Sequence, residues 1–259
     1  MPTAERPPEF VQSLERGISV IRAFSAATPR LTLSDVARET GLTRAAARRF
    51  LITLEQLGYV SNDGRFFSLR PSVLQIGYAY LSSLTLAQIA QDHLERLAQE
   101  LHESCSASVL DGDEIVYVAR AATNRIMTIN LSVGTRLPAY CTSMGRVLLA
   151  ALPDDELDSY LERTELKPLT SRTIVDRDKL RLEVVRVRAQ GWSLIDGELE
   201  EGVRSIAFPL HDADQKVVAA ANASAHGARV PLEQLRERYV PALRECAAQI
   251  DRDLAGARY

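Results

Sequence analysis

The sequence predicts an α+β protein in which a small winged helix-turn-helix domain precedes a larger domain of helices and strands. Two adjoining patterns predict the first domain: a pair of helices from Leu33 to Leu57, and a hairpin that follows them. In the rest of the chain the spacing of apolar residues changes several times between that of a helix and that of a strand, and the predicted order of elements is ααβββααα, then βββα. This order is not that of a doubly wound parallel sheet, so we expect a sheet with helices at its ends.

Composition supports two ordered domains. The chain has 259 residues and is 46% hydrophobic, which excludes disorder as its main state. We expect a flexible tail over residues 1–9, the winged helix-turn-helix over 10–70, a linker helix over 71–84 and a second domain over 85–259.

The first predicted helix runs from Ser13 to Ala26 and supports the helix pair, and Pro29 closes the segment. Its apolar positions keep helical spacing. They are Leu14, Ile18 and Ile21, with Val20 and Phe24 on the flank.

In the helix pair, Val36, Ala37 and Thr40 give the first helix a small inward face. Gly41 makes the sharp turn at low conformational cost because it has no Cβ, and Thr43 is placed to cap the second helix. These features are typical of a helix-turn-helix.

The second helix of the pair has two chemically different faces. The predicted buried stripe is Ala47, Phe50, Leu51, Leu54 and Leu57, and the opposite face carries Ala45, Arg48, Arg49 and Ile52, with Arg44 in the first exposed turn. A helix in this position of the motif enters the major groove of DNA. We therefore predict DNA contacts by Thr43, Arg44, Ala45, Arg48 and Arg49.

The hairpin after the helix pair predicts a wing. Residues 59–61 and 65–69 have strand character, and Asn62, Asp63 and Gly64 occupy the turn. Arg65 would lie at the wing tip, within reach of the neighbouring minor groove or of the DNA backbone.

Charge is divided between the two parts of the chain. Residues 1–70 hold 10 arginines against 7 acidic residues, whereas residues 71–259 hold 21 basic and 27 acidic residues. The whole chain has a net charge of only -3, but its helix-turn-helix part is positive. Because that excess is modest, we expect DNA affinity to need two or more copies acting together.

The second domain is predicted as a series of helices and strands. Pro71 breaks the chain and Ser72 can cap the linker helix, whose many apolar residues suggest packing against a partner chain or the second domain. The predicted helices are 72–84, 86–101, 143–152, 153–161, 176–190 and 232–254, the last kinked or divided at Pro241. The predicted strands are 106–110, 115–119, 126–131, 192–195, 204–210 and 217–224.

The segment from Val133 to Leu149 is a candidate anion site. A loop leads directly into a helix that Thr142 can cap, so the first backbone N–H groups of that helix would point into any cavity above it. The candidate ligands of a carboxylate are the N–H groups of Ser143, Met144 and Gly145 and the side chains of Arg120, Arg125 and Arg136. Alternatively, Thr142 only caps the helix and the arginines are solvated.

Polar residues near the end of the chain suggest further contributions to a pocket. Asn222 and Ser224 alternate onto one face of an apolar strand, and Ser205 begins the preceding strand, so all three can line one pocket. Between 195 and 205 stand four acidic residues, which could indicate a metal or acid–base site. A solvated loop is the competing interpretation, because no His or Asn joins them.

Other chemistry has little support in the sequence. The three cysteines, Cys105, Cys141 and Cys246, are widely spaced and fit structural thiols of a reducing compartment. The four histidines are scattered, and no nucleophile elbow, phosphate loop or dinucleotide fingerprint is present. We predict no metal, no cofactor and no enzymatic activity, and a cytoplasmic location because signal-peptide and membrane-spanning patterns are missing.

Four motifs, in this order and spacing, resemble the IclR family of bacterial transcription regulators over nearly the whole chain. They are LERGISVIRAF, LSDVARETGLTRAAARRFLITLEQLGYV, LPAYCTSMGRVLLA, and DGELEEGVRSIAFPL with VVAAANAS. The resemblance implies a winged helix joined by a linker helix to a GAF-like effector-binding and oligomerisation domain. It implies homodimers that commonly pair into tetramers, bound to operator DNA and to a small organic acid.

The resemblance also implies which residues hold the effector. They are the backbone amides of Ser143 and Met144, the positions of Ser205, Asn222 and Ser224, and an acid before the EEG stretch, assigned here to Asp196.

Within the family, TRAAARRFLITLEQLGYV and INLSVGTRLPAYCTSMGRVLLA resemble the branch that controls aromatic-acid breakdown through the protocatechuate and β-ketoadipate pathway. That branch implies an aromatic or dicarboxylic acid as effector. The general family pattern has Ser-Thr where Ala45 and Ala46 stand, and Tyr in place of Arg48, which suggests a different operator.

Two rival functions remain open at this stage. One is a DNA-binding protein without a ligand, whose second domain only oligomerises. The other is an enzyme with an attached DNA-binding domain.

Overall fold

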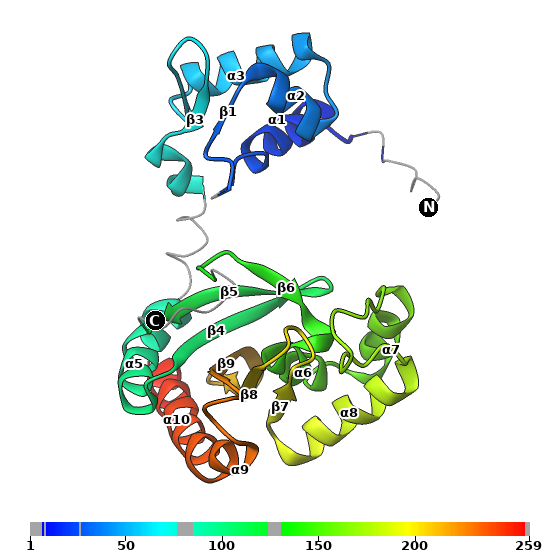
Figure 1. The fold of residues 1–259 in the computed structure, drawn as a ribbon, viewed down its shortest axis with the longest axis vertical. Helices are drawn as coiled ribbons and strands as arrows, with labels where there is room; N and C mark the ends of the chain where they lie inside the picture. The colour runs from blue at the N-terminus through cyan, green and yellow to red at the C-terminus, as the bar shows by residue number, and fades with distance from the viewer. Residues whose placement is uncertain (1–6, 8, 26, 77–84, 124–130, 257–259) are drawn as a thin grey trace. The chain divides into compact units, whose positions relative to one another are not determined.

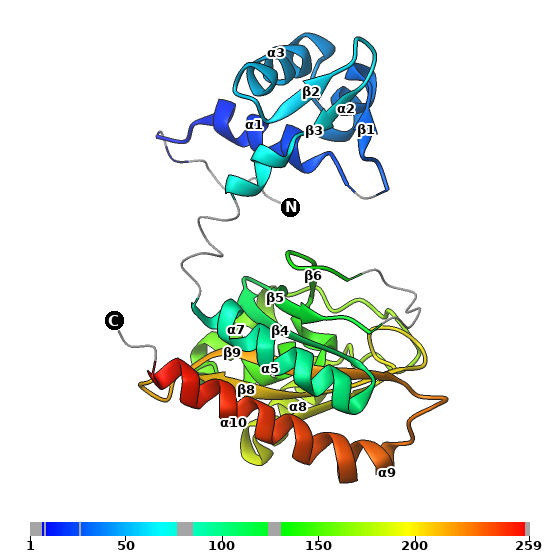
Figure 2. The same cartoon turned by 90° about the vertical axis from the view of Figure 1, so that its left-hand side faces the viewer.

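The computed structural model describes residues 7, 9–25, 27–76, 85–123 and 131–256, and the chain divides into two compact units, 1–83 and 84–259 (Figures 1 and 2). Each unit is an independent fold with its own hydrophobic core. No helix within the described residues is long and apolar enough to cross a membrane.

The first unit is a winged helix-turn-helix, as predicted. Its elements are α1 (Gln12–Arg22), β1 (Arg30–Leu31), α2 (Leu33–Thr40), α3 (Arg44–Gln56), β2 (Val60–Asn62) and β3 (Phe67–Leu69). The strands form a small antiparallel sheet in the order β1-β3-β2. Strand β1 was not predicted, because two residues are too few to show a hydrophobic period.

Local capping fixes the helix pair. Thr32 and Asp35 form a reciprocal capping box at the start of α2, and Gly41 ends that helix with a φ of 67°, in the left-handed region. Thr43 Oγ1 accepts a hydrogen bond of 3.2 Å from the Ala46 N–H, which caps α3 as predicted.

The buried face of α1 differs from the expected stripe. Val20 and Phe24 are in the core, whereas Leu14 and Ile18 are 63% and 48% exposed. Gly17, one turn before Val20, lies against the ring of Phe50 on α3, so the close approach of the two helices turns this flank inward. The helix also ends at Arg22 and not at Ala26.

Two further predictions in this unit need correction. Leu57 is exposed, because α3 ends at Gln56 and the chain turns at Gly58 before the stripe reaches another buried position. Ser72 does not cap a helix: its hydroxyl donates to the Gly58 carbonyl, and a 3₁₀ turn spans Pro71–Val73. Most of the predicted linker helix, residues 77–84, lies outside the described residues.

The second unit is built on a six-stranded antiparallel sheet, counting the described residues, in the order β6-β5-β4-β9-β8-β7. The strands are β4 (Ser104–Asp111), β5 (Glu114–Ala121), β6 (Arg136–Pro138), β7 (Ser193–Asp196), β8 (Val203–His211) and β9 (Val217–His226). The short β6 falls in a segment expected to be a loop. The predicted strand 126–131 lies almost wholly outside the described residues.

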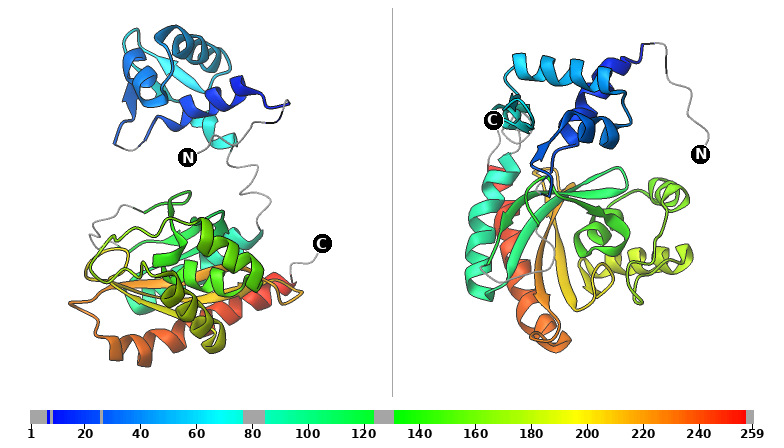
Figure 3. Two further views of the ribbon diagram at one scale, coloured as in Figure 1. Left: turned by 90° about the vertical axis from the view of Figure 1, so that its right-hand side faces the viewer. Right: turned by 45° about the horizontal axis from the view of Figure 1, so that its top comes forward.

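Helices cover both faces of this sheet, not its ends (Figures 1 and 3). On one face lie α5 (Thr85–Leu101) and α10 (Val240–Gly256), while α6 (Ser143–Ala150), α7 (Asp154–Arg163) and α8 (Arg177–Gln190) lie on the other. Alternate alanines of β9 show why: Ala219 and Ala221 enter the first core and Ala220 enters the second. A central strand buried on both faces needs helices on both.

The terminal helix is interrupted just before Pro241, as the position of this proline predicted. A short α9 (Leu232–Gln234) is followed by a π-helical turn over Leu235–Tyr239, and α10 begins at Val240. Proline has no N–H to donate, and the wider turn before it accommodates the lost bond.

Candidate functional site

The exposed side of α3 presents a row of cations. Arg44, Arg48 and Arg49 are exposed together with Ala45, and the cap residue Thr43 is exposed at the start of the helix. Within the described part of the chain no carboxylate forms an ion pair with these three arginines, whereas Arg30 and Arg38 are paired. The three guanidinium groups can therefore meet phosphates or base edges without breaking an ion pair.

The wing carries one further cation, Arg65, and Arg30 reaches it from β1 already paired with Asp63. Asp63 Oδ1 accepts hydrogen bonds from the backbone N–H groups of Arg65 and Phe66, at 3.0 and 2.7 Å, which fix the turn and lower the pKa of this carboxyl. The Phe66 ring contacts the guanidinium groups of Arg30 and Arg65, at 5.0 and 5.1 Å from the ring centroid. Arg65 was predicted as a DNA contact; the contact of Arg30 with the wing was not predicted.

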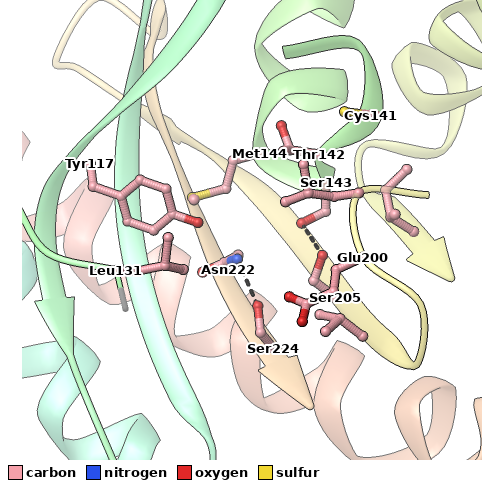
Figure 4. A pocket seen from close by; sticks show the side chains of 13 residues that line it. Tyr117, Leu131, Cys141, Thr142, Ser143, Met144, Glu200, Ser205, Asn222 and Ser224 are labelled. Atoms are coloured by element: carbon pink, nitrogen blue, oxygen red, sulfur yellow. Dashed lines mark hydrogen bonds between the residues drawn. The ribbon is translucent and has the colours of Figure 1, made fainter. Parts of the chain in front are cut away.

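The second unit contains a cavity between the N-terminus of α6 and the strands β8 and β9 (Figure 4). About 500 Å³ of space at this site is free of protein atoms, and part of that space is open solvent. The residues that line it are Tyr117, Leu131, Cys141, Thr142, Ser143, Met144, Ile195, Leu199, Glu200, Val203, Ser205, Asn222 and Ser224. A mostly apolar wall with a few polar groups is typical of a small-molecule site.

Backbone donors of α6 border this cavity. Thr142 Oγ1 accepts the Gly145 N–H at 3.2 Å, so that N–H is satisfied and cannot bind a ligand, contrary to the prediction. The N–H groups of Ser143 and Met144 have no partner among the described residues. Position 145 has room only for glycine, since a Cβ would lie 2.1 Å from the Ala139 carbonyl oxygen.

The three polar strand residues meet in the cavity. Ser205 Oγ donates to Ser143 Oγ at 2.8 Å, which joins β8 to the start of α6. Asn222 Nδ2 donates to Ser224 Oγ at 3.0 Å, but Asn222 Oδ1 has no partner although the residue is only 4% exposed. The structure thus brings Ser143, Met144, Ser205, Asn222 and Ser224 together.

Other predicted effector residues lie elsewhere. Arg136, on the edge strand β6, forms ion pairs of 2.6 Å with Asp111 and Glu114, and both acids raise its pKa. Asp196 does not line the cavity, because its carboxylate is bound by Arg172 at 2.6 Å and by Arg204 at 2.7 Å. Both residues hold neighbouring segments together.

Arg120 and Arg125 are the other two arginines predicted to hold the effector. Arg120 lies opposite Ser106 on the cavity side of the sheet and donates to its hydroxyl at 3.2 Å, but it does not reach the cavity wall. Burial lowers its pKa. Arg125 lies outside the described residues.

The acidic segment before β8 is not simply a solvated loop. Glu198 is 8% exposed and forms a 2.6 Å ion pair with Arg146 of α6, which is 2% exposed. Burial raises the pKa of Glu198, and the charge of Arg146 opposes this. Glu200 lines the cavity, as does Tyr117 of β5, and both were missed. The sequence offers no signal that distinguishes Glu200 from its exposed neighbour Glu201.

All three cysteines are free thiols and buried. Burial raises the pKa of Cys141 and of Cys246 to about 12, and also raises the pKa of Cys105, so little thiolate forms at neutral pH. We expect a thiol reagent such as DTNB to react with the folded protein about a hundredfold or more slowly than with the urea-unfolded chain. Rapid reaction of even one thiol in the folded protein would contradict this, and the unfolded sample should titrate all three.

Comparison with known proteins gives consistent matches along the chain. The family described as "Bacterial transcriptional regulator IclR C-terminal" matches residues 78–252, and "IclR helix-turn-helix domain" matches residues 13–64. The "Pca regulon regulatory protein" of Pseudomonas putida is 48% identical over 250 residues, which cover 96% of this chain and 86% of that protein.

Solved structures match as well. A protein assigned as a transcriptional regulator from Rhodococcus sp. RHA1 is 55% identical with a TM-score of 0.87, and the match covers 96% of this chain and 100% of that one. The inducer-binding domain of an Acinetobacter PobR double mutant, in complex with 3-hydroxybenzoic acid, is 33% identical with a TM-score of 0.61. That match covers 64% of this chain and 97% of the other.

Proposed function

The chain belongs to the IclR family of bacterial transcriptional regulators, and from this premise we propose that α3 binds operator DNA under the control of a small acid in the α6 cavity. It is a regulator and not an enzyme. The observation that carries the ligand assignment is the cavity itself, which is lined by Ser143 and Met144, whose N–H groups have no partner among the described residues, and by Asn222, whose buried Oδ1 is unpaired. Unpaired N–H groups at the edge of an apolar space need an acceptor, and the carboxylate of an acid supplies one.

The relatives support an aromatic acid as the ligand. The similar Pseudomonas protein is named for the Pca regulon, and the similar PobR domain holds 3-hydroxybenzoic acid. We place this chain in the control of aromatic-acid breakdown through the protocatechuate and β-ketoadipate pathway. The effector would be an aromatic acid or a dicarboxylic product of that pathway, with its carboxylate at the start of α6.

The DNA contacts would come from α3 and the wing. Thr43, Arg44, Ala45, Arg48 and Arg49 lie on one exposed side, and Arg65 lies in the wing. One copy carries a modest positive excess, so the working form would be a homodimer or a dimer of dimers in the cytoplasm that engages repeated half-sites. A ligand can control this binding only if it has different affinities for two arrangements of the assembled copies.

Replacing Ser205 by Ala together with Asn222 by Leu tests the ligand site. We expect the variant to lose the ligand response, because it lacks both the Ser205 hydroxyl that is bonded to Ser143 and the Asn222 amide whose oxygen is unpaired. Operator affinity without ligand should stay within about twofold, since the changes lie in the other unit. Gel shifts with and without an aromatic acid measure both quantities, and an unchanged response would remove the ligand assignment.

A further inference from the structure

We propose that Thr170 and Thr173 are positioning residues for the ligand cavity: their hydroxyl groups hold the loop that carries Leu199 and Glu200. Neither threonine lines the cavity, and both belong to the segment between α7 and α8. Their role rests on the proposed function, because it presupposes that the cavity binds an acid. It makes the affinity for that acid depend on residues outside the cavity wall.

The loop between β7 and β8 contributes two residues to the cavity wall. Leu199 and Glu200 line the cavity, and the Glu200 side chain lies beside Ser205 (Figure 4). Backbone hydrogen bonds close the base of this loop: the Gly197 N–H donates to the Val203 carbonyl at 2.8 Å, and the Val203 N–H donates to the Glu200 carbonyl at 3.2 Å. These two bonds leave the carbonyl groups just before Leu199 to accept from donors of another segment.

Two threonines supply those donors. Thr170 Oγ1 donates to the Gly197 carbonyl and Thr173 Oγ1 donates to the Glu198 carbonyl, both at 2.6 Å. The Thr173 hydroxyl in turn accepts hydrogen bonds from the backbone N–H groups of Leu169 and Thr170, at 3.1 and 2.9 Å. Because Thr173 is only 9% exposed, water cannot readily take its place as a donor. The two threonines are thus held by their own turn and in turn hold the loop.

Two further contacts join the same segments. Arg172 forms a 2.6 Å ion pair with Asp196, at the end of β7, and the Ile174 N–H donates to Glu198 Oε2 at 3.3 Å. Residues 170–174 therefore contact three successive residues immediately before the two that line the cavity. A binding residue keeps its place only if the groups that support it are fixed, and here that support comes from the threonine segment.

Loss of either hydroxyl group should shift the loop toward other positions. A buried carbonyl without a donor lowers the stability of the arrangement that buries it, so the chain spends less time in that arrangement. A ligand that needs Leu199 and Glu200 in place then binds only a fraction of the molecules, and its apparent affinity falls by that fraction. The hydroxyl groups therefore affect ligand affinity without contacting the ligand.

Calorimetric titration of the full-length protein tests this role with 3-hydroxybenzoate and with adipate, one acid from each class proposed above. We expect Thr170→Val and Thr173→Val to bind the acid about fivefold or more weakly than the native protein, because valine has nearly the shape of threonine but no hydroxyl group. Thr173→Ser keeps the hydroxyl group and should bind within about twofold of the native protein. Melting temperatures will verify that each variant is folded.

The matched control is Tyr140→Phe. The Tyr140 hydroxyl fastens the same segment at Lys167, donating to its carbonyl at 2.8 Å and accepting from its N–H at 3.1 Å. Tyr140 is buried and does not line the cavity, and among the described residues its hydroxyl has no hydrogen bond to the loop. We expect this variant to bind the acid as the native protein does.

Hydrogen exchange of the unliganded proteins, followed by mass spectrometry, reports on the loop itself. The peptide that covers residues 197–203 should exchange faster in both valine variants than in the native protein, in Thr173→Ser or in Tyr140→Phe.

Unchanged affinity or unchanged loop exchange in the valine variants would overturn the role of the threonines and leave the proposed function intact. So would a failure of Thr173→Ser to retain binding. An equal loss of affinity in Tyr140→Phe would show that the whole segment matters, not the two hydroxyl groups, and would also overturn it. If neither acid binds the native protein, the proposed function fails and the role of the threonines fails with it.

Discussion

Replacing Arg48 and Arg49 together by alanine is expected to weaken operator binding by about a hundredfold or more. Both side chains are exposed on α3 and have no ion-pair partner among the described residues, so their charge is available to DNA. In a dimer the double change removes four guanidinium groups from the complex. The slope of log affinity against log salt concentration should also become shallower, because fewer counterions are released.

The matched control is Arg16→Ala with Arg22→Ala. These arginines are exposed on α1, outside the helix-turn-helix, and their removal changes the net charge equally. We expect a several-fold loss from reduced long-range attraction, and no change in operator sequence preference. Gel shifts at two salt concentrations distinguish the variants. An equal loss in both would show that α3 contributes only charge and does not contact the operator.

The winged helix-turn-helix could be predicted in detail because its signals are local. Gly41 and Thr43 mark a turn and a cap by their own chemistry, and both act as expected. Features that depend on distant contacts were missed or misplaced. The buried flank of α1 is set by the approach of Gly17 to Phe50, and Arg30 reaches the wing only after β1 pairs with β3.

In the second unit, strand alternation correctly placed Ser205, Asn222 and Ser224 together, since antiparallel neighbours share a face. Charged residues were harder to assign. Arg136 and Asp196 looked available in the sequence, but each is bound by residues 8 to 25 positions away. Spacing alone does not reveal whether an arginine meets a ligand or a neighbouring carboxylate.

The buried pair between Arg146 and Glu198 connects two parts of the cavity. Arg146 belongs to α6, whose first residues, Ser143 and Met144, provide the donors, and Glu198 belongs to the loop that carries Glu200. Arg146 also donates to the Tyr140 carbonyl at 2.8 Å. The pair therefore joins α6 to the loop that carries Glu200, although neither residue of the pair lines the cavity.

Arg146→Ala is expected to lower the free energy of unfolding by about 3 to 5 kcal/mol, because it leaves the Glu198 carboxylate buried without its partner. Urea unfolding measures this change. Arg181→Ala is the control on α8: its ion pair with Asp158 is half exposed, and its loss should cost less than about 1 kcal/mol. Combining Arg146→Met with Glu198→Leu should recover part of the stability, since no buried charge is left unpaired and only the Tyr140 carbonyl and the Ile174 N–H lose a partner.

The stability that Arg146→Ala loses should also depend on pH in a defined direction. Burial already raises the pKa of Glu198 above its ordinary value of 4.5, and removing the arginine that opposes this raises it further. Between the ordinary pKa and the raised pKa of the folded variant, Glu198 is protonated in the folded variant and ionised in the unfolded chain. The stability of the variant relative to the native protein therefore falls as the pH rises through the folded pKa, and it improves as the pH is lowered. A pH-independent difference between variant and native protein would mean that Glu198 has moved out to solvent. In that case the pair would not join α6 to the loop.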